Sequence, residues 1–261
     1  MKKIIDKHIK KLENKEQKIL NKKQGIIESR LKPLVDKVKS KVPEAMKSTL
    51  DTAFYKAFQL VFENGTKYIE KFYNKEKIQS NHNINDFSID ESVNRKTIKE
   101  MDKHAQKSKL INMSISTLEG AGLGIIGMGL PDIPLFTAMI LKTIYEISLS
   151  YGYLYELDDE KVYILNLICS ALSIGEIQKK YNLHVDEISY KIDNNMQLDY
   201  DMDKEILNTS KIMSDSMLTS KFVQGIPLVG VIGSITNYTV INKISKYSTI
   251  KYKKRYLNRK K

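Results

Sequence analysis

The sequence has few of the residues on which disulfide-stabilised or metal-dependent proteins rely. Cysteine occurs once in 261 residues, which excludes an internal disulfide framework and is typical of a reducing cytoplasm. That residue, Cys169, lies in an apolar run with no histidine nearby in the sequence, so we expect a buried structural thiol. The four histidines are scattered and form no metal-binding spacing such as H-E-x-x-H. We therefore predict neither a metal nor a cofactor.

Motifs that identify a reaction are also missing. There is no G-x-S-x-G nucleophile turn and no G-x-x-x-x-G-K-[ST] phosphate loop. The N-terminus, M-K-K-I-I-D-K-H-I-K-K-L-E-N-K, has no apolar core, so we expect no secretory signal there. Apolar and polar residues do not alternate over any sustained run, which argues against strands. The sequence predicts an all-α fold, a multi-helix bundle with a glycine-rich apolar helical hairpin.

The chain does contain one unusual stretch, 118–152, which holds six of the twelve glycines. Five of them fall within ten residues, and each weakens a helix by about 1 kcal/mol relative to alanine. Gly120, Gly124 and Gly127 share one helical face. We interpret this spacing as a helix backbone packed closely against a neighbouring helix.

Within this stretch, residues 122–127 fit the dinucleotide pattern G-x-G-x-x-G. That pattern requires a strand before it and a helix directly after it. Here a predicted helix precedes the glycines and Pro131 soon interrupts the chain, so we reject a dinucleotide site.

The second half of the stretch predicts a strongly apolar helix over 133–150. Pro131 and Asp132 should begin it, with Asp132 as its cap, and Gly152 should end it. Asp132 has an alternative interpretation as a catalytic residue together with Glu119, since these two acids flank the glycines. They are weak candidates for a hydrolase site.

The run G-A-G-L-G-I-I-G-M-G-L-P-D-I-P, followed by a helix and Y-G-Y, resembles the central signature of the EcsC family. A second block at 224–237, Q-G-I-P-L-V-G-V-I-G-S-I-T-N, is similar to the C-terminal signature of that family. The resemblance spans about residues 90–257. After Y-G-Y the family tends to continue with Asp and Pro, whereas L-Y-E-L follows here. The motif positions are Gly120, Gly122, Gly124, Gly127, Gly129, Pro131, Asp132, Pro134, Tyr151, Gly152, Pro227, Gly230, Gly233 and Asn237.

This resemblance implies a bacterial, mostly helical protein. The namesake of the family is linked to an ABC-type transporter operon, and the family has no agreed biochemical activity. We therefore favour a non-enzymatic protein that assists a transporter or secretion system, with a membrane protein as a partner. A hydrolase with a site near the glycine-rich block is the alternative.

The net charge of +12 is placed unevenly along the chain. Residues 1–42 and residues 243–261 are each strongly basic, whereas the chain between them is net negative. Basic ends suit anionic lipid, because each cation near an anionic membrane surface contributes ~1 kcal/mol. The alternative is solvated charge on helix surfaces. We predict a cytoplasmic protein at the periphery of the cytoplasmic membrane, with an anionic membrane surface as its partner.

Two further patterns could indicate a different partner or a membrane span. Residues 174–192 imitate a helix-turn-helix, but the second helix would begin with Val185, Asp186 and Glu187, which suits DNA poorly, so nucleic acid is a disfavoured partner. We expect two packed helices there. Residues 222–242 are uncharged and long enough to cross a bilayer, but they include polar side chains and a proline. A buried or membrane-associating element is therefore favoured over a membrane span.

The rest of the chain reads as helices separated by short breaks. Residues 1–42 are predicted to be a basic amphipathic extension with a helix over 2–31, and residues 43–261 the EcsC-like helical domain. The polar run 79–86 is predicted to be a loop. Other expected features are helices over 44–73, 92–118, 161–172 and up to Phe222, a capping box at 173–176 and an acidic cap at 199–203.

Overall fold

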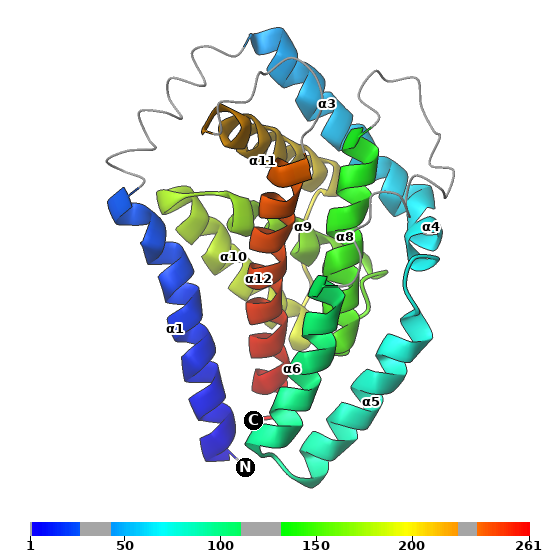
Figure 1. Cartoon of the computed structure of the whole chain (residues 1–261), viewed down its shortest axis with the longest axis vertical. Coiled ribbons are helices and arrows are strands. Elements are labelled where there is room, and N and C mark those ends of the chain that lie inside the picture. The colour runs from blue at the N-terminus through cyan, green and yellow to red at the C-terminus, as the bar shows by residue number, and fades with distance from the viewer. Residues whose placement is uncertain (1, 27–42, 111–131, 224–233) are drawn as a thin grey trace.

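The computed structural model describes residues 2–26, 43–110, 132–223 and 234–261, which form a bundle of helices (Figure 1). No strand occurs among these residues, so the predicted all-α fold is confirmed. In chain order the elements are α1 (Lys2–Ile26), α3 (Glu44–Leu60), a π-helical turn η2 (Val61–Gly65), α4 (Thr66–Glu70), α5 (Lys75–Glu91), α6 (Arg95–Leu110), α8 (Asp132–Ser150), α9 (Asp158–Leu172), α10 (Gly175–Asp193), α11 (Met202–Val223) and α12 (Ser234–Arg259).

Helix α12 runs through the middle of the bundle, with α1 on one side and α6 and α8 on the other (Figure 1). Its inward positions include Ile244, Tyr247, Tyr252 and Tyr256, each no more than 1% exposed. Helices α8 and α9 pack against this face of α12. The last helix of the chain is therefore a core element, although its sequence is strongly basic.

Helix α8 confirms the predicted apolar helix, which begins at Asp132 and ends at Ser150. Among the described helices it alone is long and apolar enough to cross a membrane, by length and composition. However, 83% of the window 133–150 is buried inside the protein. The bundle itself covers the apolar surface of this helix.

The chain leaves α8 through a turn that is anchored by tyrosines. Gly152 has a φ of 80°, a conformation that L side chains rarely adopt, which confirms its predicted role in ending the helix. Tyr151 and Tyr155 are fully buried on either side of it. Tyr155 stacks on Tyr145 of α8, with ring centroids 4.0 Å apart.

The polar run 79–86 lies inside α5, so the predicted loop is wrong. Asn74 caps this helix by accepting a hydrogen bond from the Lys77 amide at 2.7 Å. Farther along, Ile89 is buried and the Tyr256 hydroxyl donates to Asp86 at 2.6 Å. Contacts across the bundle thus outweigh the weak helix propensity of an asparagine-rich segment.

Three other predictions differ from the structure. The helix expected over 44–73 is interrupted by η2, a wider turn that displaces the following residues around the axis. Helix α10 is continuous, so the residues that imitate a helix-turn-helix contain no turn. The residue that directly precedes α10 is Ile174, one after the Ser173 expected to open the capping box, and the Ile174 side chain forms no cap bond.

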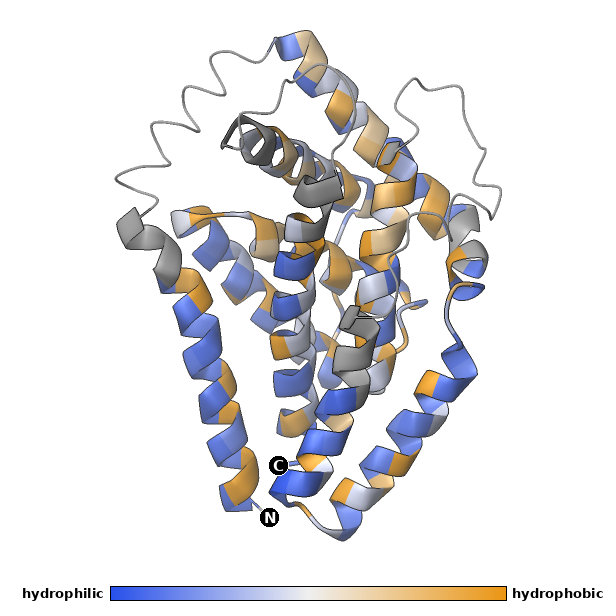
Figure 2. Ribbon diagram, viewed as in Figure 1, coloured by the Kyte–Doolittle hydropathy of each residue, from blue (hydrophilic) through white to orange (hydrophobic). Residues whose placement is uncertain are grey.

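Helix α1 packs against α12 and α10. Ile5, Ile9, Leu12 and Leu20 carry this contact and are each no more than 8% exposed. The remainder of α1 is largely hydrophilic, as Figure 2 shows. The glycine-rich parts of both signature blocks lie outside the described residues, so their close packing stays a prediction.

Candidate functional site

The residues singled out in the sequence are only partly described by the structure. Asp132 is the first residue of α8, and Pro134 and Asn237 lie in α8 and α12. Tyr151 and Gly152 form the turn after α8. The candidate acid Glu119 lies outside the described residues, so its pairing with Asp132 is untested. The same holds for Gly120, Gly122, Gly124, Gly127, Gly129, Pro131, Pro227, Gly230 and Gly233.

Cys169 is where the sequence placed it, inside the core. It is 1% exposed, and burial raises the pKa of its thiol to about 12. Its sulfur lies 3.3 Å from the Thr209 hydroxyl. A thiol in this state is inert at neutral pH, which confirms the predicted structural role. Among the described residues, no group of three His, Cys, Asp or Glu side chains could hold a metal ion.

Part of the basic C-terminal segment forms an internal network of ion pairs. Lys251 of α12 is 2% exposed and donates to Glu16 of α1 at 2.5 Å and to Asp186 of α10 at 2.9 Å. Lys254 reaches the second oxygen of Glu16 at 3.1 Å. Burial alone would raise the pKa of Glu16, but the two lysines hold it below its ordinary value. This network ties α1 to the body of the protein.

Arg255 makes a second buried network one helical turn further on. Its guanidinium donates to both oxygens of Glu160, at 2.8 and 3.0 Å, and to both oxygens of Asp193. The same group lies over the rings of Tyr153 and Tyr163, 4.0 and 4.8 Å from their centroids. Arg255 is 5% exposed. These contacts make α12 a cationic core helix neutralised by carboxylates from α9 and α10.

Neither interpretation of the C-terminal charges therefore describes Lys251 and Arg255, which are neither free for lipid nor solvated. Their partners Glu16, Asp186 and Glu160 lie 65 or more residues away in the sequence. A signal was present in the i, i+4 spacing of Tyr247, Lys251 and Arg255, which puts both cations on the face of a buried tyrosine.

A row of exposed basic charge lies on α1. Opposite the side that packs on α12, this helix presents lysines and no acid. The exposed members of this lysine face are Lys3, Lys7, Lys10, Lys11 and Lys18. Within the described part of the chain, none of them forms an ion pair. The flanking acid Asp6 is engaged by Lys261 at 2.7 Å.

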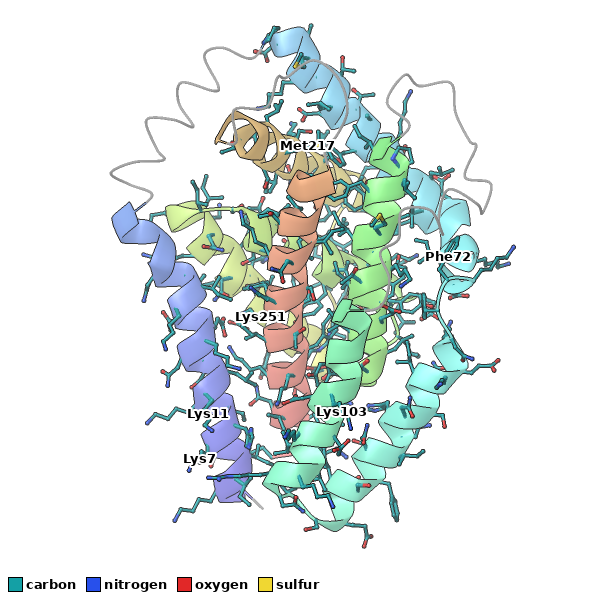
Figure 3. All side chains as sticks on the ribbon, viewed as in Figure 1. Lys7, Lys11, Phe72, Lys103, Met217 and Lys251 are labelled. Carbon is teal, nitrogen blue, oxygen red and sulfur yellow. The ribbon has the colours of Figure 1, made fainter. Side chains whose placement is uncertain are left out.

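Helix α6 extends this cationic surface on the other side of α12. Arg95, Lys96, Lys99 and Lys103 are exposed along it. Figure 3 shows Lys7 and Lys11 on α1 and Lys103 on α6, with α12 between the two helices. We call the exposed lysines and arginine of α1 and α6 the cationic face. It can attract anions without any catalytic group.

Between α1 and α6, helix α12 contributes a buried cation. Lys253 of α12 is 7% exposed and contacts both oxygens of Asp102 at 2.6 Å. Burial and then the charges of Lys253 and Lys11 lower the pKa of His8, and Arg95 acts in the same direction. The charge of Asp102 acts in the opposite direction. The field at this point of the cationic face is therefore positive.

Comparison with known proteins identifies the family of the chain. The profile of the EcsC protein family matches residues 6–257, which include most of α1. The uncharacterized protein YdbA of Bacillus subtilis (strain 168) is 24% identical over 178 residues, covering 63% of this chain and 61% of that protein. The chain thus matches less than two thirds of the length of this relative. No solved structure matches. Because the profile covers nearly the whole sequence, this chain belongs to the EcsC protein family.

Proposed function

We propose that this EcsC-family protein is a non-enzymatic, cytoplasmic protein that attaches to the anionic surface of the cytoplasmic membrane through its cationic face. There it serves as an accessory to a transporter or secretion system. The transporter link comes from the family resemblance, and a membrane-embedded partner would meet the protein at that surface.

The observation that carries this proposal is the lysine face of α1. Its five exposed lysines lie off the packed side of the helix. On the packed side, Ile5, Ile9, Leu12 and Leu20 are buried where α1 meets α12 and α10. A lysine near an anionic leaflet contributes ~1 kcal/mol. Five of them, joined by the cations of α6, are enough for reversible attachment.

The same geometry indicates attachment by charge without insertion. The apolar side of α1 is buried in the protein and cannot enter lipid unless the helix detaches. Attachment by exposed charge is screened by salt, since the Debye length is about 10 Å at 0.1 M and about 3 Å at 1 M. We therefore expect high salt to release the protein from membranes, with no need for detergent.

The test is co-sedimentation of the full chain with phosphatidylcholine vesicles that do or do not contain phosphatidylglycerol. We expect binding only to the anionic vesicles, and its loss at high salt. Replacing Lys3, Lys7 and Lys18 by glutamate should abolish it. The matched control replaces three exposed lysines elsewhere by glutamate and should retain binding. These are Lys56 on α3, Lys180 on α10 and Lys211 on α11.

Three results would contradict the proposal. Equal loss in the control variant would mean that net charge acts without any dependence on place. Release only by detergent would indicate insertion of an apolar segment. Retardation of duplex DNA at salt concentrations where vesicles are ignored would assign the cationic face to nucleic acid.

A further inference from the structure

We propose that the centre of the cationic face, around Lys253, is a binding site for the phosphomonoester headgroup of a lipid and prefers it to phosphodiester headgroups. This inference rests on the proposed membrane attachment and specifies the headgroup that the attachment selects. The site is formed by Lys253 of α12, His8, Lys11 and Lys15 of α1, and Arg95 of α6, with Asp102 of α6 as its acid.

The first argument is how Lys253 is held. Its ammonium group lies against both oxygens of Asp102, and the Tyr151 hydroxyl also approaches Asp102, at 3.4 Å. Tyr151 is fully buried. The Lys253–Asp102 pair is therefore held in place at the base of the proposed site. Helices α1 and α6 add side chains to the site from either side.

The second argument compares the carboxylates that pair with Lys253 with those that pair with the other cations of α12. Lys251 and Lys254 share two carboxylates, Glu16 and Asp186. Arg255 contacts two more, Glu160 and Asp193. Among the described residues, Asp102 is the one carboxylate that forms an ion pair with Lys253.

The ion pairs Lys261–Asp6 and Lys251–Glu16 hold α1 antiparallel to α12. In this register Lys11 and Lys15 of α1 bracket the level of Lys253, and Arg95 lies about two turns before Asp102 on the same side of α6. Burial lowers the pKa of Lys253, and the charges of Lys15 and Lys11 add to that effect against Asp102. His8 responds to the same surplus. Among the described residues, cations therefore outnumber carboxylates at this point.

The third argument is the chemistry that such a surplus favours. A phosphomonoester carries about −1.5 to −2 charge near pH 7 and offers three strong acceptor oxygens. A phosphodiester carries a single charge. Arg95 can donate two parallel hydrogen bonds to a phosphate, and lysine ammonium groups add point charges. Several cations around one point therefore favour the doubly charged headgroup, whereas lysines spread along α1 respond to average surface charge alone.

The experiment compares phosphatidylcholine vesicles that contain phosphatidylglycerol with vesicles that contain half as much phosphatidic acid, so that surface charge is matched. We expect affinity for the phosphatidic acid vesicles to be higher by on the order of tenfold. The double variant Lys15→Gln, Arg95→Gln should lose this preference and keep binding to phosphatidylglycerol. Both side chains are exposed, so the fold should persist, which a melting curve checks. The control Lys10→Gln, Lys96→Gln removes the same charge from outward positions and should keep the preference.

His8 supplies a second readout. Its imidazole resonance should titrate at a higher pH when phosphatidic acid vesicles are present, because the bound anion offsets the neighbouring cations. A separate measurement with inorganic phosphate tests whether the ligand is a lipid headgroup or a soluble phosphate. If free phosphate moved the His8 titration and displaced the protein as effectively, a soluble phosphate would be the ligand and the lipid assignment would fall.

The outcomes separate this inference from the proposed function. Binding to phosphatidylglycerol vesicles without any gain from phosphatidic acid would overturn the headgroup site and leave membrane attachment standing. Binding to neither vesicle would overturn both. A preference that survives Lys15→Gln, Arg95→Gln would place phosphomonoester recognition elsewhere and overturn the site.

Discussion

The imidazole of His82 lies directly against Gly152, so that a Cβ atom at residue 152 would come within 2.3 Å of the His82 Nε2. Nδ1 of the same ring lies 3.2 Å from the Ser150 carbonyl, to which it donates. The residue that ends α8 is thus fixed by a side chain of α5, and α5 contains the segment predicted to be a loop.

This contact predicts that Gly152→Ala is strongly destabilising. The new methyl group would collide with His82, and the positive φ adds its own strain, for an expected loss of about 2–5 kcal/mol in the free energy of unfolding. Gly175→Ala is the matched control, because Gly175 also has a positive φ, 62°, but nothing lies within 4 Å of its Cβ position. It should cost about 1–2 kcal/mol. Equal losses by chemical denaturation would show that His82 does not set the requirement.

His82 should also make stability depend on pH. Burial lowers the pKa of His82 below its ordinary value of 6.5, although the Ser150 carbonyl and Asp86 oppose the shift. The unfolded chain therefore binds a proton more readily than the folded one, so stability is lost as pH falls below that value. We expect His82→Gln to show a smaller loss of melting temperature than the parent between about pH 7 and pH 5.5. His184→Gln, at an exposed position, should leave the loss unchanged.

Glu16 should control the docking of α1. Glu16→Gln removes the charge that Lys251 and Lys254 share and leaves them with Asp186, for an expected loss of about 1–3 kcal/mol. Limited proteolysis should then cut after the lysines of α1 more readily. Since the pKa of Glu16 is depressed, its contribution is present above the ordinary glutamate value and is lost as pH falls through the folded value. Glu13→Gln, exposed on the same helix, should change neither measurement.

Arg255 should not tolerate replacement by lysine. Lysine keeps the charge but cannot donate to Glu160 and Asp193 together or lie flat on the ring of Tyr153. We expect Arg255→Lys to lower the free energy of unfolding by about 1–3 kcal/mol. Arg259→Lys is the control, because Arg259 also lies over Tyr153, with its guanidinium 4.8 Å from the ring centroid, but is exposed. Indifference of stability to Arg255→Lys would mean that the buried network is held by charge alone.

The features that could be predicted correctly from the sequence are those that depend on residues close together in the chain. Helical periodicity and capping are local, so the start of α8 at Asp132, its end before Gly152 and the helix over 161–172, which lies within α9, were all predicted. Asp201 caps α11 as expected, by accepting from the Lys204 amide at 3.1 Å. The family was also recognisable, because its signature blocks are short and continuous.

Which charges are buried depends on how distant helices meet in the folded protein. Lys251 is paired with Glu16, 235 residues away, and Arg255 with Glu160, 95 residues away. No pattern along the chain links such positions, and composition alone placed all the C-terminal cations at the surface. Burial of an ion depends on whether carboxylates from other helices meet it in space, because an unpaired buried charge costs several kcal/mol. Residues 79–86 are likewise helical because of distant contacts. Helix α5, which contains them, packs against α8 and bonds to α12, and these contacts form only in the folded bundle.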